Sequence, residues 1–234
     1  MVKSPSTEST TEPIAPFTEA DLEAVREAVR EAEGGTSGEI VPFVVPASDP
    51  YLSAVWKGAA FGALCGPLVA LAAFLLGGGF WGAWGLRGAV SLWMVLPAAA
   101  GGVAGYFLTA YVPAVKRWLA GPVMLEARVR QRASLAFLAE EVFSTRERTG
   151  ILLFVSLFER RVVVLGDSGI NRQVEAAHWE GVVATVVAGL RAGRPGAGLA
   201  AGIRQCGELL ARFGVAIRPD DSNELADDLR RGDV

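Results

Sequence analysis

The sequence predicts an α/β protein, a small α/β/α sandwich with a mixed sheet that is interrupted by a two-helix transmembrane hairpin. Three observations predict this class. The 234 residues are 51% hydrophobic and 20% charged, which is more apolar than a soluble domain usually is. The apolar excess lies in one block, residues 58–115, in which Arg87 is the only side chain charged at neutral pH. On both sides of this block, helical and strand-like patterns follow one another.

The segment before the block, residues 17–55, predicts one helix and one strand. Thr18 has the side chain of an N-cap residue, with an acid three positions later, so we expect the helix to begin there. Gly34-Gly35 predicts its end. Residues 39–45 form an apolar run that predicts a strand, and Pro42 favours an edge or a bulge for it.

The central segment, residues 56–118, predicts two membrane-spanning helices. Arg87 divides the block into two stretches, each longer than the ~20 apolar residues that cross a bilayer core. The Gly- and Trp-rich residues 80–87 between them are typical of an interfacial turn. Small residues recur at helical spacing and are expected to pack the spans against each other or against a second copy of the chain; they are Gly58, Gly62, Gly66, Gly101 and Gly105.

Basic residues at the ends of the block predict its orientation. Lys57 precedes the first span, and Lys116 and Arg117 follow the second, whereas the connecting turn carries Arg87 alone. Positive charge near spans favours the cytoplasmic side. The N-terminus has no apolar stretch of the kind found in a cleaved secretory signal. We therefore expect both termini in the cytoplasm.

The segment after the block, residues 119–214, predicts three helices and two strands. A helical pattern over residues 125–143 leads to an apolar run at residues 151–157, which is typical of a strand covered on both faces. Residues 162–165 return as the second strand of a hairpin. Two amphipathic helices follow, the first beginning near Ile170.

Charge counts indicate that the two flanking segments form one domain. Residues 1–57 carry four basic and ten acidic side chains, a net of −6, and residues 116–234 carry seventeen basic and fifteen acidic, a net of +2. One helix and one strand cannot bury a core alone, so the first segment needs the second. Residues 1–16 are expected to be a disordered tail and residues 215–234 an acidic C-terminal tail.

Candidate chemistry centres on Gly166-Asp167-Ser168-Gly169, which leads from a strand into a helix. The backbone N–H groups of Gly166, Ser168 and Gly169 are candidates to hold an anion. Asp167 is a candidate catalytic nucleophile toward a phosphate. The alternative is a tight turn with a capping side chain. The net charge of −3 and the interleaved acids argue against nucleic acid as a partner.

A metal site is the second candidate. Glu39 begins the first predicted strand, and Asp167 and Asn171 follow the last one. If these strands lie side by side, the three oxygen-bearing side chains would suit Ca²⁺ or Mg²⁺. Otherwise Glu39 is a solvated strand end.

These residues resemble the TPM-domain family. Its pattern of a helix and a turn running into a strand is similar to Glu33-Gly34-Gly35-Thr36-Ser37-Gly38-Glu39-Ile40. Its later signature, a Gly-led apolar strand, a basic turn and a strand ending in glycine, is similar to residues 149–170. The sequence has Gly166-Asp167-Ser168-Gly169 where the family commonly has a Gly-Tyr-Gly turn.

The resemblance is greatest to the bacterial membrane branch, in which a transmembrane hairpin interrupts the domain after its first strand. It implies a compact α/β/α domain at the bacterial inner membrane. For some members of the family it implies weak acid phosphatase activity or calcium binding. We expect a non-catalytic module that binds or helps to assemble a membrane-protein partner, and the alternative is a divalent-metal-dependent phosphatase that uses Asp167 and Glu39.

Overall fold

The computed structural model describes residues 17–76, 86–213, 215 and 224–233, apart from the side chains of residues 74 and 86–94. The chain forms two compact units, the α/β unit (residues 1–48 and 129–234) and the hairpin unit (residues 49–128). The expected tail over residues 1–16 and most of the expected turn over residues 80–87 lie outside the described residues.

The sheet of the α/β unit has four strands in the order β3-β2-β1-β4. β1 (Glu39–Val45) runs parallel to β2 (Gly150–Ser156), and β2 runs antiparallel to β3 (Arg161–Gly166). β4 (Arg230–Arg231) is parallel to β1. The predicted mixed sheet and the predicted β2–β3 hairpin are confirmed.

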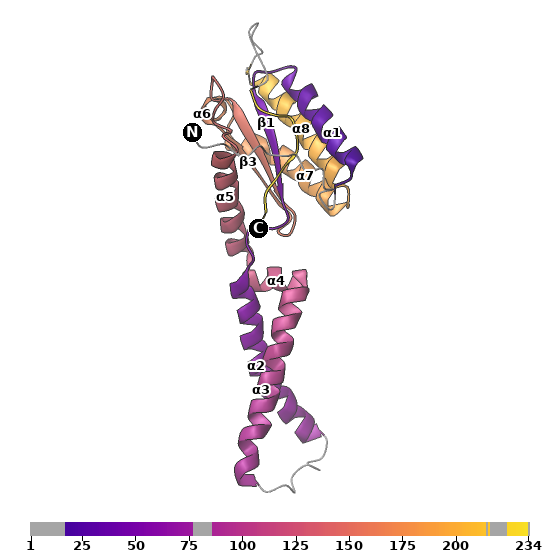
Figure 1. Cartoon of the computed structure of the whole chain (residues 1–234), viewed down its shortest axis with the longest axis vertical. Helices are drawn as coiled ribbons and strands as arrows, with labels where there is room; N and C mark the ends of the chain where they lie inside the picture. Colours follow the sequence, from indigo (N-terminus) through magenta and orange to yellow (C-terminus); the bar gives the residue numbers. More distant parts are fainter. Residues whose placement is uncertain (1–16, 77–85, 214, 216–223, 234) are drawn as a thin grey trace, which may run out of the picture. The chain divides into compact units, whose positions relative to one another are not determined.

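Helices cover both faces of this sheet (Figure 1). α1 (Glu19–Glu33), α7 (Glu180–Arg191) and α8 (Pro195–Arg212) lie on one face. The half of α5 (Pro122–Ala139) that belongs to this unit lies on the other. The side chains of β2 alternate between the two cores and all seven of its residues are buried, as its continuous apolar run predicts.

Local signals position the helices. The Thr18 hydroxyl accepts from the Asp21 N–H at 3.2 Å, and the Asp21 carboxylate accepts from the Thr18 N–H at 2.9 Å, so the predicted cap is a complete capping box. The expected helix near Ile170 is broken, however, into a one-turn α6 (Ser168–Asn171), a 3₁₀ turn (Ala176–Trp179) and α7.

Pro42 lies inside the sheet, which corrects the expectation of an edge or a bulge. The Glu39 N–H donates to the Thr149 carbonyl, and the Val45 carbonyl accepts from Leu157, so these alternate residues bond on the β2 side. Pro42 lies at an even-numbered position of β1, so its backbone nitrogen, which carries no hydrogen, faces the β4 side. Because β4 pairs only with Phe43 and Val44, no ladder bond is lost.

The C-terminal segment, expected as an acidic tail, contains β4 and returns to the domain. Arg230 and Arg231 pair with Phe43 and Val44, and the Gly232 N–H donates to the Val44 carbonyl at 3.1 Å. The segment has few apolar residues, so the sequence carries no strand signal there. β4 forms because it finishes the otherwise open edge of β1.

The hairpin unit contains α2 (Leu52–Leu76), α3 (Leu86–Tyr111) and α4 (Pro113–Ala120). α2 and α3 pack side by side, and a Cβ atom added at Gly62 would lie 2.1 Å from the Gly101 carbonyl oxygen. α2 is long and apolar enough over Leu52–Ala73 to cross a membrane, and the part of α3 from Val95 meets this criterion only together with α4, across a bend of 99°.

Candidate functional site

The Gly166–Gly169 turn lies where β3 ends and α6 begins. Asp167 is the N-cap of α6, and its carboxylate accepts from the Ser168 N–H at 2.5 Å. Its second oxygen lies 3.5 Å from Nη1 of Arg148. The Asp167 side chain is 11% exposed, so this carboxylate is mostly enclosed and already holds a cap and an ion pair.

Three backbone donors of this turn, those of Asp167, Ser168 and Gly169, have protein acceptors. The Asp167 N–H donates to the Gly150 carbonyl at 2.9 Å, and the Gly169 N–H donates to the Arg148 carbonyl at 2.9 Å. With the Ser168 N–H held by Asp167, three successive amides serve the fold. The hydrogen bonds therefore match the tight, capped turn rather than an anion-binding turn.

Close packing explains both glycines of the turn. A Cβ at Gly169 would lie 2.4 Å from the Glu147 carbonyl oxygen and 2.6 Å from that of Arg148. A Cβ at Gly166 would lie 2.8 Å from the Ile170 side chain. Glycine at these positions lets the turn approach the 147–148 loop.

The structure separates Glu39 from the other two predicted metal ligands, Asp167 and Asn171, which lie together at α6. Glu39 and Asp167 lie at the same end of the sheet, but β2 separates their strands, a spacing of roughly 9–10 Å. The Asn171 side-chain amide donates to the Gly166 carbonyl at 2.5 Å. Among the described residues, no group of three or more His, Cys, Asp or Glu side chains is close enough to hold a metal ion.

Glu39 fastens the C-terminal segment to β1. Its carboxylate accepts from the N–H groups of Glu224 at 3.1 Å and Leu225 at 3.4 Å, and the residue is 6% exposed. A buried carboxylate requires such donors, so Glu39 is neither solvated nor directed at Asp167. The sequence reasoning missed this role because the partners are backbone groups 185 and 186 residues away.

An open hollow of about 420 Å³ lies beside the Gly166–Gly169 turn. Arg148 takes a left-handed backbone conformation there, with φ of 60°, and its guanidinium donates to the Phe143 carbonyl at 3.1 Å. Arg172 is exposed at the rim. Because Arg148 is paired with Asp167, Arg146 and Arg172 stand against Glu147, and this smaller excess of positive charge favours an anion. The lining is Arg146, Glu147, Arg148, Thr149, Gly169, Arg172 and Gln173.

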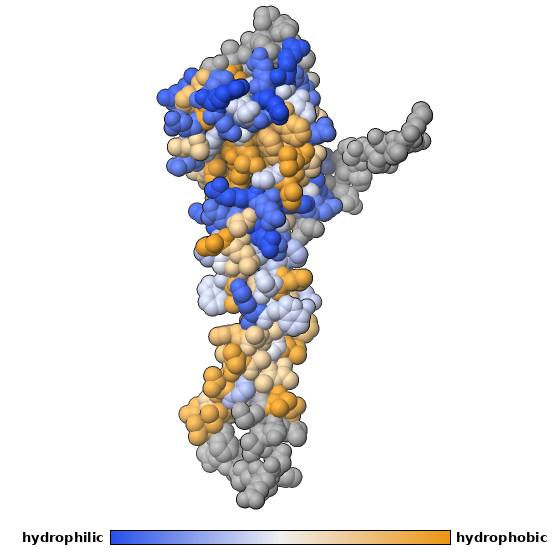
Figure 2. Space-filling model, turned by 90° about the vertical axis from the view of Figure 1, so that its left-hand side faces the viewer, coloured by the Kyte–Doolittle hydropathy of each residue, from blue (hydrophilic) through white to orange (hydrophobic). Residues whose placement is uncertain are grey.

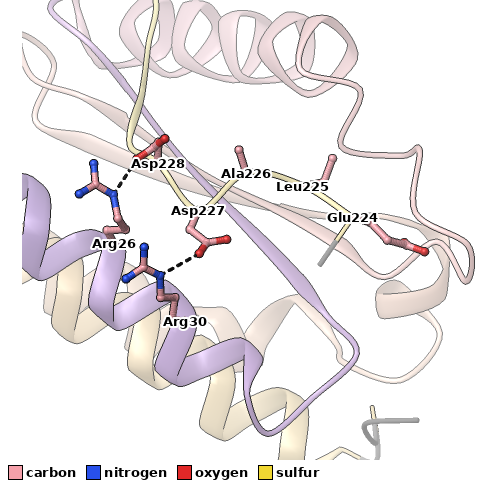
Figure 3. A pocket seen from close by; sticks show the side chains of 7 residues that line it. All are labelled: Arg26, Arg30, Glu224, Leu225, Ala226, Asp227 and Asp228. Carbon is pink, nitrogen blue, oxygen red and sulfur yellow. Dashed lines mark hydrogen bonds and ion pairs between the residues drawn. The ribbon is translucent and has the colours of Figure 1, made fainter. Parts of the chain in front are cut away.

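A second hollow, of about 460 Å³, follows the seam between α1 and the C-terminal segment (Figure 3). Arg26 Nε lies 2.8 Å from Asp228 Oδ1, and Arg30 Nε lies 3.2 Å from Asp227 Oδ2. The hydrogen bond that Arg26 donates to the Asp228 carboxylate raises the pKa of Arg26, and the negative charge of Asp228 adds to the effect. These paired charges fasten the segment across α1 and leave the seam without a free cationic centre among the residues that line it.

A buried polar cluster lies at the carboxyl ends of β1 and β2, where the sequence indicated only a turn. The Ser48 and Ser156 hydroxyls lie 2.8 Å apart, and the Glu159 carboxylate accepts from the Ser48 N–H at 2.9 Å and from the Ser156 hydroxyl. Ser156 and Glu159 are buried. The cluster joins the residue 46–48 segment to the β2–β3 turn. Its signal in the sequence is a glutamate in a tight turn, close to a serine that ends an apolar strand.

Comparison with known proteins adds a fold likeness. No family model and no curated protein matches the chain. The NMR structure of BA42 protein from the psychrophilic bacterium Bizionia argentinensis sp. nov. aligns with a TM-score of 0.54 over 92% of this chain and 94% of that chain, at 19% sequence identity. At this identity the likeness establishes a mixed α/β fold and nothing about activity.

Proposed function

We propose that this protein is a membrane-anchored α/β module of the TPM type at the bacterial inner membrane, which binds or assembles a membrane-protein partner without catalysis. The observation that carries the proposal is where large apolar side chains are exposed. Every exposed large hydrophobic residue among those described lies between Leu52 and Leu138, and most lie on α2, α3 and α4.

The hairpin unit has its small residues inside and its large apolar residues outside. Leu64 is 72% exposed and Leu68 is 64% exposed on α2, while the glycines of α2 face α3. In Figure 2 the described part of the hairpin is largely orange and white, whereas blue is widespread over the α/β unit. Large apolar patches mark contact with a membrane or a protein, and small residues at the helix contact are typical of membrane helices.

The basic residues support an orientation with both termini in the cytoplasm. Lys57 precedes most of the first apolar stretch, and Lys116 and Arg117 follow the second. Positive charges near spans favour the cytoplasmic side. The Lys57 ammonium donates to the Leu119 carbonyl at 3.3 Å, so these charges belong to one end of the hairpin.

The hydrogen bonds of the candidate catalytic residues favour a binding module over an enzyme. Asp167 caps a helix and pairs with Arg148, and Glu39 holds two backbone amides of the C-terminal segment. A nucleophile or a metal ligand would have to give up these interactions, and a buried donor left without its acceptor costs about 1–3 kcal/mol.

The anchoring is tested in membranes that contain the full chain. We expect the protein to remain in the pellet after alkaline carbonate extraction. Cysteines introduced by Ser4→Cys or Asp233→Cys should resist an impermeant thiol reagent in intact cells, and Ala83→Cys, within the turn that the sequence predicts, should react. Labelling of Ser4→Cys from outside would reverse the orientation, and release of the protein by carbonate would end the membrane proposal.

One observation favours the second function, a metal-dependent phosphatase. The arginine-rich hollow lies beside Asp167, where a phosphate monoester would be attracted. Purified protein should then hydrolyse p-nitrophenyl phosphate with Ca²⁺ or Mg²⁺, and both Asp167→Asn and Arg172→Gln should reduce turnover. Turnover lost in Asp167→Asn and retained in the matched surface variant Arg191→Gln would replace the binding proposal with the enzyme.

A further inference from the structure

The short helix α4 is fixed at both ends by its sequence. Val112 is extended, with φ of −104° and ψ of 100°, because the residue before a proline avoids the helical conformation. Pro113 then opens α4, and Gly121, with a positive φ of 81°, closes it. The Gly121 N–H donates to the Arg117 carbonyl at 3.1 Å. The chain therefore turns by 99° between α3 and α4.

α4 lies across the end of the hairpin and contacts α2 (Figure 1). Lys57 of α2 donates to the Leu119 carbonyl of α4, which ties the two helices together. Ala120 is buried and Leu119 is half-buried, whereas Trp118 is 76% exposed. One side of α4 is thus used for packing, and a large indole group projects from the other.

Aromatic and basic side chains gather at this end of the hairpin unit. Trp56 and Tyr111 are exposed like Trp118, and Lys116 and Arg117 lie half-buried on α4. Apart from Arg87, residues 49–128 carry four basic and two acidic side chains, a net of +2. Tryptophan and tyrosine favour the membrane–water interface, and basic residues beside them attract anionic headgroups.

We propose that α4 is an in-plane interfacial helix that binds anionic phospholipid headgroups through Lys116 and Arg117, with Trp118 inserted at the headgroup level. This inference rests on the proposed membrane anchoring. If α2 and α3 cross the bilayer, a helix at 99° to α3 runs nearly parallel to its surface. The other arrangement, a broken span with α4 at hydrocarbon depth, would bury two cations in hydrocarbon.

The depth of Trp118 is measured with the full chain in nanodiscs of phosphatidylcholine and phosphatidylglycerol that carry bromine at defined acyl positions. Subtracting the Trp118→Phe signal isolates this indole. Quenching should be strongest for bromine nearest the headgroups. Strongest quenching by bromine near the bilayer centre, or no quenching at all, overturns the interfacial position.

The lipid preference is measured as enrichment of phosphatidylglycerol over phosphatidylcholine around the purified protein. K116Q/R117Q should lower this enrichment by about fivefold for each cation removed. R191Q/R194Q, which removes two exposed cations of the α/β unit, is the matched control and should leave it unchanged. Equal enrichment in the two variants overturns the inference while carbonate-resistant anchoring stands. Extraction by carbonate would defeat the anchoring itself.

Discussion

In two helix pairs of this chain, the helices pack closely on each other at glycine residues. The outward faces of the two pairs, however, differ in polarity. In the α/β unit, a Cβ at Gly207 of α8 would lie 2.8 Å from the Ala32 Cα of α1. In the hairpin unit, a Cβ at Gly101 of α3 would lie 2.2 Å from the Gly62 carbonyl oxygen of α2. The outer side of the first pair carries ion pairs such as Arg204–Glu31 at 2.6 Å, and that of the second carries leucines.

The difference shows that close packing alone does not reveal the surroundings of a helix pair. α1 and α8 bury valines and leucines against the sheet, so removal of apolar area from water stabilises them. α2 and α3 keep their large apolar groups outside, so the contact between them depends on van der Waals packing of small residues. This comparison makes four predictions, and the largest concerns the buried sheet.

Phe154→Ala should cost the α/β unit about 3–5 kcal/mol of unfolding free energy. Phe154 is fully buried in β2 and stacks on Phe43, with ring centroids 5.8 Å apart, so truncation leaves a cavity. Leu64→Ala removes an apolar group that α2 exposes and should change helix stability by less than about 0.5 kcal/mol. Urea unfolding in detergent micelles, followed by near-UV dichroism, measures both. Equal losses would mean that the outer face of α2 is covered by protein.

Gly101→Ala should weaken the α2–α3 contact by about 1–3 kcal/mol, because its methyl group has no room beside Gly62. The neighbouring Gly102→Ala is the matched control, since a Cβ there would come no nearer to its neighbours than 3.4 Å, at the Ala63 Cβ. Both changes raise helix propensity equally, so the difference between the two variants isolates the contact. Fluorescence energy transfer between labels on α2 and α3 during denaturation measures it. Matching curves would show that glycine is not what brings the helices together.

The sequence predicts the sheet and its covering helices well because their signals are local. The capping box at Thr18, the apolar runs of β2 and β3 and the periodicity of α8 each lie within one element. The site residues were harder to assign, because the roles of Glu39 and Asp167 depend on partners distant in sequence. β4 has no local signal, since pairing with β1 alone makes it a strand.

The pH dependence of the unfolding free energy tests how completely water is excluded from Cys206, a buried residue of α8. Burial raises the pKa of its thiol from 9.0 to about 12, so the unfolded chain loses this proton first. The stabilisation is complete below pH 9 and falls by about 1.4 kcal/mol per pH unit as the pH rises toward 12. Cys206→Ala should start less stable and lose stability less steeply above pH 9 in denaturant titrations. Parallel curves for the two proteins would indicate that water reaches this helix contact.

Asp228→Asn should have the smallest effect, about 0.2–1 kcal/mol, because its partner Arg26 lies on the solvated face of α1. The raised pKa of Arg26 leaves its charge constant at every pH at which the domain folds, so the pair responds to salt rather than to arginine titration. A double-mutant cycle with Arg26→Ala should give a coupling energy that shrinks as ionic strength increases. A coupling above about 1 kcal/mol that persists in high salt would place the seam in a desolvated environment. The C-terminal segment would then act as part of the core. The contrast between the polar outer surface of α1 and the apolar outer surface of α2 would then not extend to this seam.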